Sequence, residues 1–128
     1  MSFVWASRKP NEGLATLYEN NITLNKSASS HFDKAHSVLL GLDYDKQRIA
    51  LKPITKQELE RGIIPKEKQH KITVRQSYAR VCNKKFMQEV AKLMQLNLVD
   101  NTAYKFKTMW SKNDHALIID LTKHEEVL

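Results

Sequence analysis

Residues 14–53 read LATLYENNITLNKSASSHFDKAHSVLLGLDYDKQRIALKP, a stretch with a clear order of predicted elements. It contains a predicted strand pair, an Asn-Lys at a helix start, a short amphipathic helix and a β-hairpin, in that order. Residues 72–121 repeat this order of elements with a longer second half. The doubled unit predicts an α+β, mainly β fold, in which two β-hairpin/helix/β-hairpin units form a small barrel from interlocking halves.

The first unit begins with a predicted hairpin. Strands over 14–18 and 22–24 flank Glu19-Asn20-Asn21, where asparagine tolerates the left-handed backbone of a tight turn. Asn25 is expected to cap a helix over 26–35, because its side chain can accept hydrogen bonds from free amides of the first helical turn.

That helix is expected to be amphipathic. Its apolar face carries Ala28, Phe32 and Ala35. The opposite face is expected to meet water or a partner, and it carries Ser27, Ser29, Ser30 and His31.

A second hairpin ends the first unit. Strands are predicted over 37–43 and 48–52, and the second alternates Ile49 and Leu51 with more polar neighbours, which is typical of a half-buried strand. Pro53 is expected to end it, because proline has no amide hydrogen for a strand ladder.

Residues 54–70 are expected to connect the units. Thr55 and Glu58 have capping-box spacing, which predicts one or two helical turns that end near Gly62. A solvated linker is the alternative, above all around Pro65.

The second unit covers 71–121. Residues 72–84 align without gaps with 14–26, an offset of 58 that places Asn83-Lys84 on Asn25-Lys26, so Asn83 should cap a helix over 85–95. The buried stripe of this helix is expected to contain Phe86, Met87, Val90, Ala91 and Met94, and its exposed face Lys85, Gln88, Glu89 and Lys92.

Two strands follow this helix. After a turn at Asp100-Asn101, one is expected over 103–110, with Trp110 in the core. The other covers 116–121 and is expected to be buried on both faces, whereas 124–128 should be frayed.

Composition limits the classes of protein that fit. The 128 residues suit one domain, and Cys82, the single cysteine, cannot form a disulfide within the chain, so it is expected to be a small buried residue in a cytoplasmic protein. No run approaches the roughly 18 apolar residues of a membrane span. No Cys/His ligand spacing, nucleophile turn or glycine-rich phosphate loop is present, which predicts a protein that is not an enzyme and has no cofactor, metal or evident small-molecule substrate.

Asp43 and Asp45 lie beside a predicted turn, and their side chains are expected to accept hydrogen bonds from its backbone amides.

Net charge is +7, and residues 46–92 contain thirteen basic and four acidic residues, a balance of +9. A basic central surface attracts polyanions, so DNA is the expected partner, while solubility alone is the other explanation of the charge. Tyr78 and Tyr104 could stack on bases, although packing is the simpler role for each. The phosphate-binding side chains are expected to be Lys71, Arg75, Arg80, Lys84 and Lys85.

Residues 22–54, ITLNKSASSHFDKAHSVLLGLDYDKQRIALKPI, resemble the AbrB/MazE-type swapped-hairpin domain in their strand, short helix and closing IALKP strand. The resemblance implies a swapped-hairpin-like pseudo-dimer and an AbrB-like transcriptional regulator that binds DNA. The chain departs from the family at Asn25, where proline is common, and at serines where members have basic residues. The segment ITLNKSA (22–28) is also similar to part of some small bacterial proteins, which implies no activity.

Two points stay open. A module that binds an acidic protein segment by strand addition is the alternative function. A monomer is expected if the two halves complete one barrel, and a homodimer if each half pairs with another chain.

Overall fold

The computed structural model describes residues 2–3, 5, 12–99 and 102–127, with only the backbone for 124–127. The elements of the first unit are β1 (Leu14–Leu17), β2 (Asn21–Asn25), α1 (Lys26–Ser29), the 3₁₀ turn η1 (Ser30–Phe32), β3 (Ser37–Asp43) and β4 (Arg48–Ile54). The remaining elements are α2 (Lys56–Glu60), η2 (Lys66–Lys68), β5 (Thr73–Val74), β6 (Tyr78–Cys82), α3 (Lys84–Met94), β7 (Tyr104–Ser111) and β8 (Ala116–Val127).

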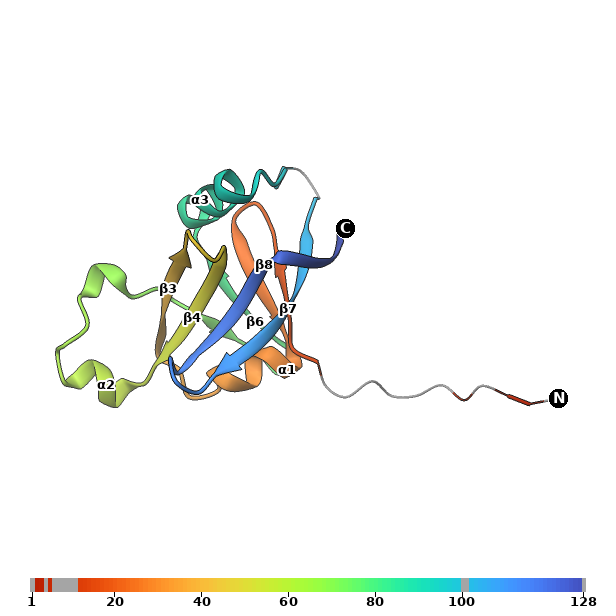
Figure 1. Ribbon diagram of the computed structural model, residues 1–128. Coiled ribbons are helices and arrows are strands. Elements are labelled where there is room, and N and C mark those ends of the chain that lie inside the picture. The colour runs from red at the N-terminus through yellow and green to blue at the C-terminus, as the bar shows by residue number, and fades with distance from the viewer. Residues whose placement is uncertain (1, 4, 6–11, 100–101, 128) are drawn as a thin grey trace.

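The fold is mainly β, as the sequence predicts. Eight antiparallel strands form one curled, half-barrel sheet in the order β3-β4-β8-β7-β1-β2-β6-β5 (Figure 1). A single bridge between Val38 and His70 joins β3 to the segment before β5, with N···O distances of 2.9 and 2.8 Å. None of the described helices is long and apolar enough to cross a membrane.

The strand order changes little when the two units are exchanged. If β1–β4 are relabelled β5–β8, and β5–β8 are relabelled β1–β4, then six of the seven pairs of neighbouring strands in the sheet are the same as before. The seventh, β7–β1, becomes β3–β5, which is where the Val38–His70 bridge lies. The units differ in the length of the chain between their hairpins, because α3 has 11 residues and α1 only four.

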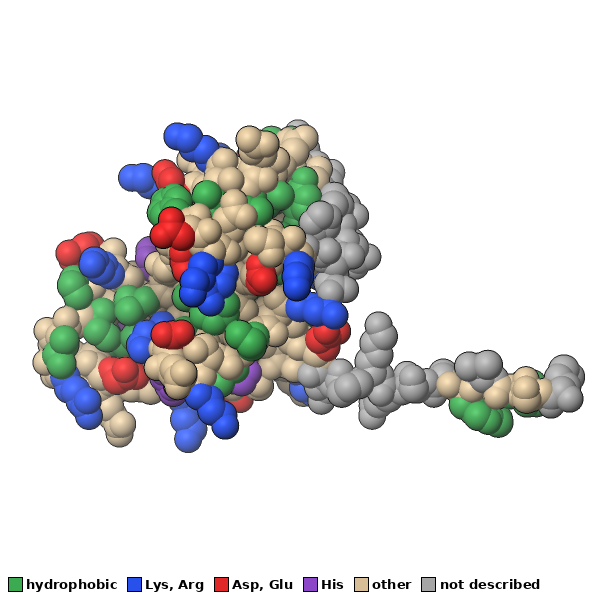
Figure 2. Space-filling model, viewed as in Figure 1, with side chains coloured by type: hydrophobic (Ala, Val, Ile, Leu, Met, Phe, Trp, Pro, Cys, Tyr) green, Lys and Arg blue, Asp and Glu red, His purple; other side chains and the backbone are tan. Residues whose placement is uncertain are grey.

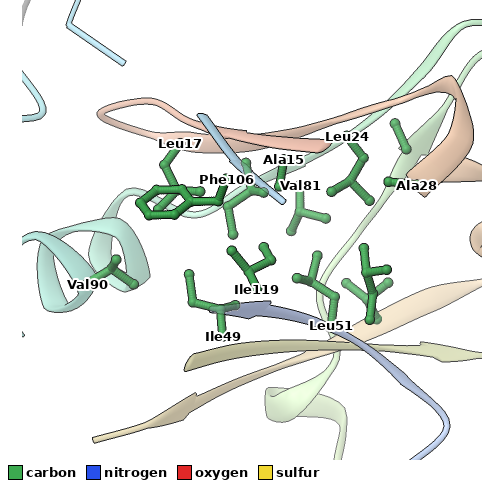
Figure 3. Close-up of a cluster of buried hydrophobic side chains, with 14 of the residues drawn as sticks. Ala15, Leu17, Leu24, Ala28, Ile49, Leu51, Val81, Val90, Phe106 and Ile119 are labelled. Atoms are coloured by element: carbon green, nitrogen blue, oxygen red, sulfur yellow. The ribbon is translucent and has the colours of Figure 1, made fainter. Parts of the chain in front are cut away.

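The core fills the inside of the curled sheet. Leu17, Leu51, Phe106 and Ile119 are fully buried there, with contributions from both units (Figure 3). Phe32 is fully buried as well. β8 lies between β4 and β7, and Ala116–Ile119 are buried on both faces, as the apolar run predicts.

The helix starts are as predicted. Asn25 Oδ1 accepts from the Ala28 amide at 3.0 Å, and Asn83 Oδ1 accepts from the Phe86 amide at 2.9 Å. The predicted capping box of α2 is also present, because Thr55 Oγ1 accepts from the Glu58 amide and the Glu58 carboxylate accepts from the Thr55 amide. Gly62 follows α2 with φ of 67°.

The stripe of α3 is confirmed. Met87 and Val90 are buried, and the four residues predicted to be outside are exposed. Phe86, Ala91 and Met94 are partly buried against the core. The two helix caps, Asn25 and Asn83, are 58 residues apart, as the alignment predicts. The corresponding buried strand residues, Ile22 and Ala79, are 57 residues apart. One residue is therefore added between strand and helix in the second unit.

The predicted end of β4 was wrong, because the strand continues through Pro53 to Ile54. Pro53 is opposite Val38, whose amide and carbonyl both bond to His70 instead of β4. An amide hydrogen at Pro53 would therefore point away from β3, toward the side where β8 pairs with β4. The last β4–β8 pair is Leu51 with Leu117, so Pro53 lies beyond it and its lack of an amide hydrogen removes no hydrogen bond between the strands.

The helix predicted over 26–35 was too long, because α1 and η1 end at Phe32. Ser29 was wrongly placed toward water: it is buried, and its hydroxyl donates to the Lys26 carbonyl at 2.9 Å. The predicted fraying of 124–128 was wrong for the backbone up to Val127, which pairs with Tyr104. The predicted turn at Asp100-Asn101 lies outside the described residues.

Candidate nucleic-acid interface

The outer face of β6 is polar. Ala79 and Val81 point into the core, so Tyr78, Arg80 and Cys82 lie on the outside of the sheet. Cys82 is exposed, which corrects the prediction that it is buried. The alternation of the strand places it outside because its neighbour Val81 faces the core.

A row of polar residues crosses this face from strand to strand. Thr23 is the partner of both Thr16 and Arg80, which joins β1, β2 and β6. The row extends to Thr73 on β5 and to Lys105 on β7. Residues directly opposite each other on one face have neighbouring side chains, so Arg80 and Lys105 are placed on the same surface with threonines between them.

Contacts on both sides orient Arg80. Its Nε donates to Thr23 Oγ1 at 3.2 Å, and its guanidinium lies 5.1 Å from the centre of the Tyr78 ring. Thr23 in turn donates to Asn21 Oδ1 at 2.8 Å. The remaining guanidinium hydrogens of the exposed Arg80 are available to a ligand, in the planar arrangement that suits a phosphate.

Lys84 and Lys85 form the start of α3, and both are exposed. The first turn of this helix contains no acidic residue. Two cations at the positive end of a helix are electrostatically unfavourable, so the free protein gains no stability from their position. An anion bound there would interact favourably with both lysines and with the helix dipole.

Lys71 and Arg75 lie on either side of β5. Lys71 follows His70, whose ring nitrogen is 3.3 Å from the Asn83 side-chain amide, so it lies near the start of α3. Arg75 belongs to the opposite end of the hairpin, where its amide bonds to the Tyr78 carbonyl at 2.8 Å. Arg80 lies between these two ends.

The five predicted residues therefore form one band along β5, β6 and the start of α3, which we call the basic strip: Lys71, Arg75, Arg80, Lys84 and Lys85. All five are exposed, and none forms an ion pair with another residue in the described part of the chain. The five residues of β6 alone cover about 17 Å at roughly 3.4 Å per residue.

The row of polar residues across β7, β1, β2, β6 and β5 was not predicted from the sequence. Thr16, Thr23 and Lys105 come from three different strands, and only the strand register brings them beside Arg80. Tyr78 is placed beside Arg80, where a base could also reach it. Tyr104 is opposite the buried Leu17 on the inner face, which agrees with packing and not with base stacking.

The predicted core position of Trp110 was only partly right. Trp110 is half-buried, and its ring stacks on His31 with centroids 4.5 Å apart and planes at 3°. His115 meets the same ring edge-on at 5.2 Å. Among the described residues, no three His, Cys, Asp or Glu side chains are grouped so that they could hold a metal ion.

Three carboxylates away from the basic strip have lowered pKa values. The Lys46 amide is the main cause for Asp43, the Thr55 amide for Glu58, and the Thr122 hydroxyl for Asp120, since each hydrogen bond stabilises the charged form. Asp43 accepts from the amides of Asp45 and Lys46, which confirms its predicted role in the turn.

Comparisons of the chain with protein-family models, with curated proteins and with solved structures find no match in any of the three.

Proposed function

We propose that the protein binds duplex DNA through the basic strip. The observation that carries this proposal is the uniform sign of the segment from His70 to Gln88, which contains five basic residues and no acidic one, and which forms a single band on the surface. Unopposed cations spaced along a surface are the arrangement that phosphate backbones select.

The geometry within the strip supports the same function. Arg80 is held by Thr23 and Tyr78 before any ligand arrives, which lowers the entropy lost on binding. Lys84 and Lys85 lie where an anion relieves an unfavourable interaction with the helix dipole.

The proposed architecture is a swapped-hairpin pseudo-dimer within one chain. Its support is the strand order, which keeps six of seven neighbour pairs when the units are exchanged. Together with the resemblance of residues 22–54 to the AbrB/MazE-type domain, this arrangement favours the role of a cytoplasmic transcriptional regulator.

The test is a titration of labelled duplex DNA followed by fluorescence anisotropy at several salt concentrations. If about five phosphates are contacted, affinity should fall by about 10²–10³-fold between about 50 and 200 mM salt. The double variant Arg80→Ala and Lys84→Ala should bind more weakly and with a shallower salt dependence, reduced by about two phosphate contacts.

The matched control removes two exposed lysines elsewhere, Lys56→Ala on α2 and Lys112→Ala in the β7–β8 turn. This control should keep most of the affinity. No binding of duplex DNA at the lower salt concentration, or an equal loss in the control and the test variant, would refute the proposed function.

Strand addition of an acidic segment is a second candidate, and one observation favours it. After Val38, no backbone hydrogen bond joins the outer edge of β3 to another described segment. An extended peptide could add to this edge at Leu40 and Leu42. Titration of acidic peptides, with DNA as competitor, separates this function from binding at the basic strip.

A further inference from the structure

The outer face of β3, β4, β8 and β7 differs from the basic strip. One apolar row crosses all four strands, because Gly41 is opposite Ala50, Ala50 is opposite Ile118, and Ile118 is opposite Met109. β4–β8 and β2–β6 are separated in the strand order, so this face and most of the strip lie over different parts of the outer surface of the sheet. They come closest at His70, which precedes Lys71 and lines the hollow of this face. We call the row and its flanking charges the apolar face.

The apolar face has a hollow and a projection. Gly41, Ala50 and Ala116 are small, and they line a hollow of about 670 Å³. Met109 belongs to the same row, two strands beyond Ala50, and the residue is 63% exposed. Charged side chains, among them Arg48 and Lys52, also line this hollow beside its small apolar residues. An exposed methionine in the same row as a hollow with small apolar residues is a pair of complementary shapes on one surface.

Gly41 is not required by the fold of the single chain. Its φ lies outside the left-handed region, and a Cβ added to it would meet Ala50 only at 3.7 Å, an ordinary contact. Glycine within a strand costs about 0.5–1 kcal/mol relative to alanine, and it often marks a close approach of another group. The hollow above Gly41 therefore points to an occupant from outside the chain.

Charges of both signs alternate next to the apolar row. Asp43 is opposite Arg48 and Arg48 is opposite Asp120, while Lys107 lines a smaller hollow with Arg48 and Asp120. Figure 2 shows red and blue side chains in alternation across this face, with green ones beside them. Such a mixed surface does not suit a polyanion.

We propose that a second copy of this chain covers the apolar face. A twofold axis in the interface, parallel to the strands and between β4 and β8, places β3 over β7 and β4 over β8 of the other copy. Met109 of each copy then enters the hollow over Gly41 and Ala50 of the other. The contact is isologous, because both copies use the same surface.

The same axis matches the charges. It sets Arg48 opposite Asp120 of the other copy, and Asp43 opposite Lys107. Within one chain Lys107 already pairs with Glu12 at 3.3 Å, so Asp43 of the other copy would add to that ion pair. Within one chain, Arg48 and Asp120 are cross-strand partners but form no ion pair within 4.0 Å among the described residues. The guanidinium of Arg48 contacts Asp43 through Nη2 at 3.2 Å, and its Nε has no hydrogen-bond partner in the described part of the chain.

The experiment is sedimentation velocity of the full chain over concentrations up to about 1 mM, a range that reveals even a weak dimer. The wild type is expected to show a monomer–dimer equilibrium. Met109→Thr should weaken the dimer at least about tenfold, since an anchor side chain in a pocket commonly accounts for that much affinity. Ile63→Thr, an exposed apolar residue on the connector, is the matched control and should leave the dimer unchanged.

A charge exchange separates the interface from a folding defect. Arg48→Glu alone and Asp120→Lys alone each place like charges opposite each other in a homodimer, so each should be monomeric. Mixed in equal amounts, the two variants should form a heterodimer, because the introduced glutamate of one then faces the introduced lysine of the other, and the remaining Asp120 faces the remaining Arg48. A wild type that is monomeric throughout, a dimer insensitive to these changes, or no heterodimer on mixing would overturn the proposal.

Discussion

Asn25 has a wider role than the helix cap that the sequence predicts. Its Oδ1 accepts from the Leu14 amide at 3.0 Å as well as from α1, and its Nδ2 donates to the Glu12 carbonyl at 2.9 Å. One side chain thus joins the start of β1, the end of β2 and the start of α1. Asn83 likewise caps α3, and its side-chain amide lies 3.3 Å from the His70 ring nitrogen, so it also links the start of its helix to the chain before β5.

The hydrogen bonds between Glu58 and Thr55 provide a test of the contribution of a single residue. The Thr55 hydrogen bonds hold the pKa of Glu58 below its ordinary value of 4.5, so the folded state favours the carboxylate. Its stabilising effect is therefore complete above the unfolded pKa and disappears as pH falls through the lower folded pKa. In denaturant unfolding, the stability difference between wild type and Glu58→Gln should shrink as the pH is lowered from 7 to about 3.

The change should be modest, because Glu58 is partly exposed to solvent. Glu67→Gln, at an exposed residue in the same connector with no hydrogen bond among those described, is the control for the removal of one negative charge. A stability difference for Glu58→Gln that stays constant across this pH range would contradict the assigned cause.

Residues whose role depends on near neighbours were the ones that the sequence could predict. The caps Asn25, Asn83 and Thr55 act on amides three residues ahead, so spacing alone identifies them. The row at Thr23 and Arg80 joins residues 57 positions apart, and no local pattern contains that register.

Among the helices and strands, α3 shows how the spacing of its apolar residues determines which side of the helix faces the core. Its buried stripe places Met87 and Val90 against the core, while Gln88 and Glu89 face solvent. β4 shows the opposite case, because the tolerance of Pro53 depends on His70, which takes the hydrogen bonds of the opposite residue, Val38. Proline is a reliable strand breaker only where its amide would face a paired strand.

Two adjacent positions on α3 test its packing. Met87→Ala should lower the free energy of unfolding by about 2–5 kcal/mol, because it leaves a cavity at a position that is 1% exposed. Gln88→Ala should change it by no more than about 0.5 kcal/mol. Urea unfolding measures both, and equal effects would show that α3 does not dock by the Met87 face.

At the scale of the whole molecule, the two units depend on each other for their strand neighbours. β4 pairs with β8, β1 with β7 and β2 with β6, so three of the seven pairs in the sheet join the units. The sequence predicts the doubled order of elements, but these pairings depend on register between distant strands. The apolar face was missed for the same reason, because Gly41, Ala50, Ile118 and Met109 come from four strands.

Cleavage of the connector tests this interdependence. A protease site inserted after Gly62, which is exposed and has open space around it, should be cut without loss of structure. The two pieces should migrate together in size-exclusion chromatography and unfold in one transition, because three strand pairs still hold them. The uncut insertion variant is the control, and separation of the pieces without denaturant would contradict the interlocked arrangement.

The position of β8 also affects how the chain folds during translation. Leu51 on β4 pairs with Leu117, which is made 66 residues later, and Leu14 on β1 pairs with Lys107. A nascent chain that has emerged only to the connector therefore exposes the strand edges of β4 and β1 beside the ribosome. Chaperones that shield such edges would be most valuable to this protein in the interval before β7 and β8 leave the exit tunnel.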